Sequence, residues 1–383
     1  KDCQNHLPLI IRKLIQASNL NIQSLFFPAG DSVFRKGWDG MLEVNGGNAL
    51  IPSGKSLWEI GTSQTPSTKA DGDYGKRKTE PGVDDPSQYT YVFVTPRRWV
   101  DKVSWQQEKA KENFWKDVIV LDADDLETHL EHAPNVAIEL GRKLGVLTGT
   151  VDPLKLWWTD WSEAPDPKIA PGLLVAGRDS AKAKVVEWLQ SDKSELTIQA
   201  STKDEVSAFI AACIEGMNEQ EKDALYSSTV KVKEESELMD FLSIQNPHII
   251  INTTENIELN TRLTQAGHRV IQPLGIENTR NKNTLSLPLP KQEAFITALI
   301  DSKLSRKKAT HLAKESGRSF SVLRRLTLPQ VNQPGWAKSE NAQFLIPALI
   351  AGQWDEDFEG DRAVLEEIAG KPYAEIVRKL HTF

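Results

Sequence analysis

The sequence lacks several features that define whole classes of protein. Cysteine occurs only as Cys3 and Cys213, far apart in the chain, which argues against a disulfide framework and against a cysteine-rich zinc site. No apolar run approaches the roughly eighteen residues needed to cross a bilayer. The opening stretch also lacks the apolar core and cleavage site of a signal peptide. We therefore expect a cytoplasmic protein.

An excess of basic charge is also missing, because the formal net charge is −7 at pH 7. This balance disfavours a chain that coats nucleic acid indiscriminately, although a local basic groove is compatible with it. The length of 383 residues exceeds what one hydrophobic core usually supports. The sequence therefore predicts a chain of two or more domains.

The first part of the chain alternates helix and strand patterns. Apolar spacing predicts a helix over residues 6–17. "GWDGMLEV" (37–44) and "NALI" (48–51) read as the strands of a hairpin around the turn "NGG", and "KSLWEIGTS" (55–63) reads as a third strand. After a polar, breaker-rich stretch with a short helix around 73–78, the buried strands "YTYVFVTP" and "DVIVLDA" flank a helix. We expect residues 1–147 to form a mixed sheet flanked by helices.

The rest of the chain divides into three segments. Residues 148–172, rich in proline and glycine, predict a linker whose three tryptophans at 157, 158 and 161 clamp the domains together. Residues 173–290 repeat strand and helix patterns and predict a parallel α/β domain. Residues 291–383 are helical in pattern. The fold class is therefore α/β with a helical C-terminal portion.

Two acidic residues mark the neighbouring strands of the first domain. Asp39 and Glu59 could supply the hard oxygen ligands of a divalent metal, and Glu43 is either a further ligand or an exposed side chain. Side chains alternate along a strand, so a lysine at position 61 would lie beside a metal-bound water. The chain has Gly61 there. Asp39 could equally stabilise a turn and Glu59 could be a solvated strand residue.

The ordered motifs "GWDG", "PSGKSLWEIGTS", "KADGDYGKR", "FVTPRRW" and "VIVLDADDLETHL" resemble the PD-(D/E)XK restriction-endonuclease-like nucleases, in a bacterial branch, over about residues 1–145. The resemblance implies that Asp39 and Glu59 bind Mg²⁺ or Mn²⁺ and that the domain hydrolyses DNA. The general pattern has a lysine where this chain has Gly61. We expect Lys69 to be a migrated lysine that replaces it.

Basic residues of the same motifs are candidates for contact with DNA. Lys76 and Arg77 in "KADGDYGKR" are expected to contact phosphate groups. Arg97 and Arg98 in "TPRRW" follow a strand directly, where they either meet a DNA backbone or form a solvated pair. DNA is therefore the expected partner of the first domain.

The second domain has the order of strands and helices of a nucleotide-binding domain but lacks the sequence motifs that bind the nucleotide. A phosphate-binding loop requires glycines and a lysine, whereas "QASTKDEVSA" has no glycine and retains only Lys203. Asp204 and Glu205 bring negative charge to the helix N-terminus, where it would repel phosphate. The strand "HIIINTTENI" ends in Asn252 and Thr253 rather than in an acidic magnesium ligand. ATP is therefore not expected as a cofactor.

The segments "AGRDSAKAKVVEWL" and "AKESGRSFSVLRRL" nevertheless resemble the core and the helical lid or winged-helix part of bacterial STAND-type antiphage proteins, over about residues 170–370. The resemblance implies a degenerate, AAA-like NTPase module that forms homo-oligomers behind a nuclease effector. It also implies a C-terminal sensor region that this chain does not contain. Arg318, Arg324 and Arg325 would contact phosphate, a neighbouring subunit or solvent, and His248 and His268 are expected to be structural.

The sequence thus predicts a metal-dependent DNA endonuclease of bacterial antiphage defence, with an NTPase-like module for assembly or regulation. Two alternatives remain open. The first is a catalytically dead DNA-binding or assembly module, because position 61 lacks lysine. The second is a nucleotide-driven switch whose unusual loop still holds ATP.

Overall fold

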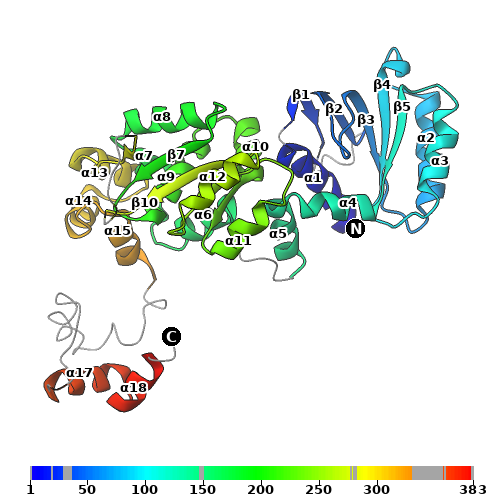
Figure 1. Ribbon diagram of the computed structural model, residues 1–383. Helices are drawn as coiled ribbons and strands as arrows, with labels where there is room; N and C mark the ends of the chain where they lie inside the picture. The colour runs from blue at the N-terminus through cyan, green and yellow to red at the C-terminus, as the bar shows by residue number, and fades with distance from the viewer. Residues whose placement is uncertain are drawn as a thin grey trace.

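The computed structural model describes residues 2–18, 20–28, 37–145, 151–276, 278, 283–329, 357 and 359–380. Two β-sheets, each with helices on its faces, lie side by side (Figure 1). This arrangement confirms the coarse prediction of an α/β chain. Across the part of the chain that is described, no helix is both long and apolar enough to cross a bilayer.

The first sheet contains five strands in the order β1-β2-β3-β4-β5. Both β1–β2 and β2–β3 pair antiparallel, while β3–β4 and β4–β5 pair parallel. The sheet is therefore mixed, as expected. Its strands are β1 (Asn21–Phe26), β2 (Gly40–Asn45), β3 (Gly54–Ile60), β4 (Tyr89–Val94) and β5 (Asp117–Leu121).

Two groups of helices cover the two faces of this sheet. Helices α1 (Asp2–Ala17), α4 (Ala123–Glu131) and α5 (Pro134–Lys143) pack on one face through an aliphatic core. Helices α2 (Pro66–Thr79) and α3 (Lys102–Ala110) pack on the other through a core rich in tryptophan and tyrosine. Because side chains alternate along β3, Trp58 belongs to the first core and Leu57 to the second. Glu59 and Gly61 therefore face α2.

The second sheet has six strands in the order β11-β7-β10-β9-β8-β6. The five strands β7 to β11 run parallel, as the sequence predicted, and β6 pairs antiparallel with β8. The strands are β6 (Asp152–Pro153), β7 (Glu195–Gln199), β8 (Thr229–Val232), β9 (Ile249–Asn252), β10 (Arg269–Leu274) and β11 (Leu285–Ser286).

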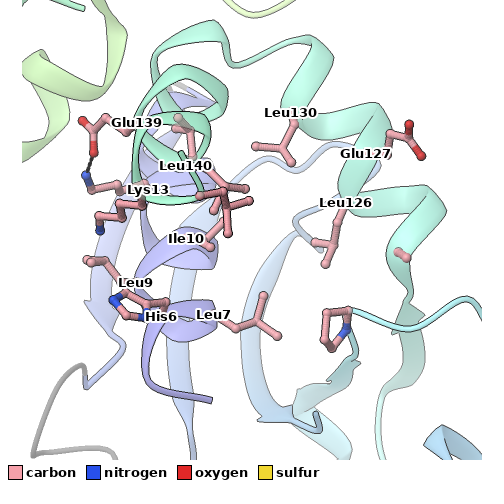
Figure 2. Close-up of a pocket in the computed structure, with 15 residues that line it drawn as sticks. His6, Leu7, Leu9, Ile10, Lys13, Leu126, Glu127, Leu130, Glu139 and Leu140 are labelled. Atoms are coloured by element: carbon pink, nitrogen blue, oxygen red, sulfur yellow. Dashed lines mark hydrogen bonds and ion pairs between the residues drawn. The ribbon is translucent and has the colours of Figure 1, made fainter. Parts of the chain in front are cut away.

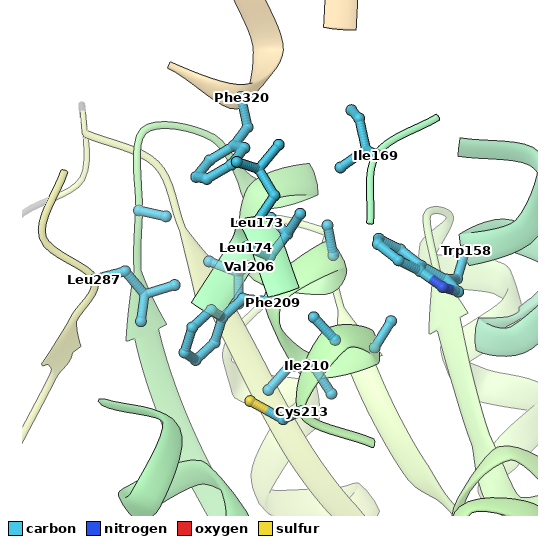
Figure 3. Close-up of a cluster of buried hydrophobic side chains, with 14 of the residues drawn as sticks. Trp158, Ile169, Leu173, Leu174, Val206, Phe209, Ile210, Cys213, Leu287 and Phe320 are labelled. Atoms are coloured by element: carbon cyan, nitrogen blue, oxygen red, sulfur yellow. The ribbon is translucent and has the colours of Figure 1, made fainter. Parts of the chain in front are cut away.

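Helices enclose this sheet on both sides and bury a large apolar core (Figure 3). Helix α9, which follows β7, is buried along most of its length. The helices of this unit are α6 (Leu154–Glu163), α7 (Pro171–Val175), α8 (Asp179–Leu189), α9 (Lys203–Glu215), α10 (Glu219–Ser228), α11 (Glu235–Phe241) and α12 (Glu258–Gln265).

The segment expected as a linker, residues 148–172, is largely part of this second unit. Strand β6 joins the second sheet, and Trp158 and Trp161 of α6 are buried in the core of that unit. Two indole rings carry enough apolar area to hold a short helix on the sheet, although the surrounding residues are polar and rich in proline. The tryptophans therefore stabilise the second unit, and residues 146–150 lie outside the described part.

The C-terminal portion is helical where it is described. Helices α13 (Gln292–Asp301), α14 (Arg306–Glu315) and α15 (Phe320–Thr327) add Phe295, Leu312 and Phe320 to the second core. Helices α17 (Glu359–Ala369) and α18 (Tyr373–Leu380) contact each other. The stretch "FLIPALIAGQWDEDFEGDRAVLEEIAG" (344–370) was also predicted to be helical; α17 lies in its second half, and residues 344–356 and 358 lie outside the described part.

The two units meet through α1 and α5 of the first and α10 and β6 of the second. Asn135 is buried at this junction and donates its amide hydrogens to the carbonyl oxygens of Tyr226 at 3.0 Å and Thr229 at 2.9 Å. Arg12 approaches Asp223 of α10 at 3.8 Å. Buried hydrogen bonds between units fix their mutual orientation more firmly than exposed ion pairs do.

Candidate active site

Asp39 and Glu59 come together at one edge of the first sheet. The register of β2 on β3 places Gly40 opposite Trp58, so the residue before β2 lies beside the end of β3. Asp39 Oδ2 accepts a hydrogen bond from the Ile60 amide at 2.8 Å, and the charge of its carboxyl group acts on Glu59. Glu59 is buried, with 6% of its surface exposed. The two acids therefore converge in a place sheltered from water.

Burial raises the pKa of both acids, and the charge of Asp39 adds to the rise at Glu59. Burial raises the pKa of Asp39, while the Ile60 amide and Glu59 oppose this change. Burial, followed by the charge of Asp39, raises the pKa of Glu59 to about 7 although Arg77 opposes it. Two close carboxylates resist losing both protons unless a cation lies between or beside them. The pair therefore has the electrostatic character of a cation site.

Three charged side chains of α2 face this edge of the sheet. Lys69, Asp73 and Arg77 are four residues apart along the helix, so they lie on the same side of it. Lys69 Nζ donates to Asp73 Oδ1 at 2.6 Å. Asp73 Oδ2 and the hydroxyl oxygen of Tyr91 are buried and have no hydrogen-bond partner among the described residues. Buried polar atoms of this kind normally need a partner such as water or an ion.

Arg77 lies inside the protein rather than on its surface. Its Nε donates to Glu59 Oε1 and its Nη2 donates to the carbonyl oxygen of Gly37. The guanidinium carbon lies 4.3 Å from the ring centre of Trp38. The sequence suggested a phosphate-contacting residue here, whereas the structure places the guanidinium among the acids with 7% of the side chain exposed.

Gly61 leaves a space that Lys69 enters. A Cβ atom at position 61 would lie 2.6 Å from Phe93 Cζ and 2.9 Å from Lys69 Cγ. Both distances are too short for a real contact between carbon atoms. A lysine at position 61 would therefore have to displace the Phe93 ring or the stem of Lys69, which passes the position that such a lysine would take.

The two acids fit a magnesium-like ion better than a zinc-like one. Among the residues that the structure describes, no group of three or more histidine, cysteine, aspartate or glutamate side chains is placed to hold a metal. Mg²⁺, however, commonly binds through one or two carboxylates and completes its shell with water and substrate phosphate. Asp39 and Glu59 would be those carboxylates, and the unpartnered Asp73 Oδ2 would be near enough to influence them electrostatically.

Other basic residues surround the site to different extents. Lys76 is exposed on α2. Arg97 is exposed just after β4, whose last residue pairs with Ile60, so it lies at the same edge of the sheet as Glu59. Arg98 is exposed and forms ion pairs with Asp124 at 2.8 Å and Glu127 at 3.6 Å. Lys76 and Arg97 are therefore better placed than Arg77 to meet a ligand from solvent.

The carboxylate of Glu205 binds the loop between β7 and α9. Glu205 accepts a hydrogen bond from the Ser201 amide at 3.3 Å and pairs with Arg178 at 2.5 Å, and both side chains are 1% exposed. Lys203 donates to the carbonyl oxygen of Thr253 at 2.9 Å and pairs with Glu255. The amide and the lysine that would meet a phosphate group thus have partners within the chain.

A separate apolar pocket of about 660 Å³ lies between α1, α4 and α5 (Figure 2). Leucines such as Leu7, Leu126 and Leu140 line it, and the ion pair of Lys13 with Glu139 borders it. These helices cover the face of the sheet opposite to α2. The pocket is therefore distinct from the acid pair, and the amphipathic pattern of its helices was its signal in the sequence.

Neither the family models scanned nor the curated proteins searched give a match to the chain.

Proposed function

We propose that the first unit is a divalent-metal-dependent nuclease of the restriction-endonuclease-like type that hydrolyses DNA phosphodiesters. The observation that carries this proposal is the position of Lys69. Its stem passes Gly61, on the same side of the sheet as the Asp39–Glu59 pair. Two acids and a lysine on one sheet edge provide a metal site together with a cationic nitrogen for the reacting phosphate.

Each residue has a separate task in this proposal. Asp39 and Glu59 hold Mg²⁺ or Mn²⁺, which when bound lowers the pKa of its water and neutralises charge on the phosphate. Lys69, whose side chain is 43% exposed, can leave Asp73 and direct its ammonium group to a phosphate oxygen or to the attacking water. Lys76 and Arg97 contact the DNA backbone and position it.

The second unit is proposed to be an NTPase-like module that has lost nucleotide binding and supports assembly into homo-oligomers. Its parallel sheet and the helix α9 that follows β7 support the likeness. The internal partners of Ser201 and Lys203 support the loss of nucleotide binding. A role as effector of antiphage defence follows from the combination of these two modules.

The test is cleavage of plasmid DNA with Mg²⁺ or Mn²⁺, and binding of Mn²⁺ measured by calorimetry on the same proteins. Asp39→Ala and Glu59→Ala should abolish both cleavage and metal binding, whereas Lys69→Ala should abolish cleavage and retain the metal. Lys55→Ala is the matched control, because Lys55 is an exposed lysine of β3, near the end of that strand opposite to Glu59. Equal metal binding by wild type and both acid variants would overturn the proposal. A gel shift with metal binding but no cleavage would favour a DNA-binding module.

A further inference from the structure

Arg77 is the cation that contacts the acid pair in the described structure. Its guanidinium reaches Glu59 through Nε and the carbonyl oxygen of Gly37 through Nη2. Gly37 stands two residues before Asp39 in the sequence. One planar side chain therefore connects the two segments that carry the acids, a task that suits the fork of donors in arginine and not the single ammonium group of lysine.

The surroundings of Arg77 keep it in this position. Its side chain is 7% exposed, and the ring of Trp38 stacks against the guanidinium at 4.3 Å. Trp38 is itself fixed, because its Nε1 donates to the carbonyl oxygen of Pro81 at 2.9 Å. A residue that merely contacted DNA would not need to be buried or held from three sides.

We propose that Arg77 is a positioning residue that serves as the internal cation of the Asp39–Glu59 pair and stabilises the site until a divalent ion takes over that charge. The inference rests on the proposed function of the acids. A buried carboxylate that loses its partner is strongly destabilising. A bound divalent ion supplies the positive charge that Arg77 otherwise provides, so the stabilising effects of Arg77 and of the metal partly replace each other.

This replacement predicts a measurable coupling between Arg77 and the metal. The Tm of wild type and of Arg77→Gln is measured in EDTA and in excess Mn²⁺. In EDTA, Arg77→Gln should unfold about 10 °C below wild type, as expected for the loss of one partner of a buried ion pair. Addition of Mn²⁺ should raise the Tm of Arg77→Gln by about 3 °C or more beyond the gain of wild type.

Two further variants separate this role from simple structural damage. Arg178→Gln removes the arginine of the buried pair with Glu205 in the other unit. This variant should also lower the Tm, but its gain from Mn²⁺ should be no larger than that of wild type, because its acid pair keeps Arg77. Arg77→Lys keeps the positive charge and loses the fork of donors, so its Tm in EDTA should lie below that of wild type while its gain from Mn²⁺ stays close to that of wild type. If Arg77→Gln does not fold in EDTA, refolding with Mn²⁺ should recover it.

The possible results separate the inference about Arg77 from the proposed metal site. An equal gain from Mn²⁺ in wild type and Arg77→Gln, or no recovery of an unfolded Arg77→Gln by Mn²⁺, contradicts the inference while the metal site stands. If Mn²⁺ raises the Tm of none of these proteins, and Glu59→Ala binds Mn²⁺ and cleaves DNA as wild type does, both the proposed metal site and the inference are contradicted.

Discussion

Replacement of Gly61 by alanine tests the packing that excludes a lysine from this position. The added Cβ would lie 2.6 Å from Phe93 Cζ, and the Phe93 ring is 0% exposed. That ring also packs edge-on against Trp99, with ring centres 6.2 Å apart. Phe93 therefore has little room to move away, and the methyl group must displace either the ring or the stem of Lys69.

The cost of this substitution can be estimated from the crowding. One extra methyl group in a tightly packed core destabilises a protein by about 1–3 kcal/mol. A loss of 1 kcal/mol lowers the Tm of a domain of this size by roughly 2–4 °C. Gly61→Ala should therefore lower the Tm by about 2–12 °C. Gly61→Lys, which places a lysine where the restriction-endonuclease-like pattern has one, should cost at least as much and should not increase cleavage.

Thermal unfolding of four proteins measures the effect and its cause. The set is wild type, Gly61→Ala, Phe93→Leu and the double variant. If the ring of Phe93 is the obstacle, Gly61→Ala should cost less in the Phe93→Leu background, by about 0.5 kcal/mol or more. A Gly61→Ala protein that unfolds at the wild-type temperature would refute the reasoning.

Three further predictions follow from other contacts. Lys69→Met should reduce DNA cleavage by about 10²-fold or more, with Mn²⁺ affinity in calorimetry within about threefold of wild type because Lys69 is not a ligand. Asn135→Ala should lower the free energy of unfolding by about 1–3 kcal/mol in urea titration, because two buried carbonyl groups lose their donor; an unchanged midpoint would contradict this. Burial lowers the pKa of His248 from 6.5 to about 4, so the stability due to its neutral form is complete above pH 6.5 and is lost as pH falls toward 4. Thermal unfolding between pH 4 and pH 8 should therefore show a smaller acid loss for His248→Asn than for wild type.

The paired strands of the site could be predicted because their signals are local. The alternation around Asp39 and Glu59 predicted β2 and β3, and their register brings Asp39 to the end of β3. The strand predicted at 48–51 was wrong, because Leu50 and Ile51 pack in the aliphatic core and β3 is the partner of β2. The role of Arg77 could not be predicted in the same way. Gly72 and Gly75 weaken the helical pattern of α2, so the sequence indicated only a short helix there.

A prediction of the whole of α2 would have shown which of its charged side chains lie together. Lys69, Asp73 and Arg77 share one face only because α2 includes all three of them. Their four-residue spacing was a signal in the sequence, but it has meaning only once the helix is known. The linker shows the same dependence, because Trp158 looked like a contact between domains until its helix was placed on the second sheet. Tertiary packing determined both outcomes, since local composition favoured loops.

The most direct measurement is anomalous scattering from crystals of the protein grown with Mn²⁺. We expect a peak within about 2.0–2.3 Å of carboxylate oxygens from both Asp39 and Glu59. No peak at this edge of the sheet, in crystals whose Mn²⁺ concentration saturates binding in solution, would contradict the account.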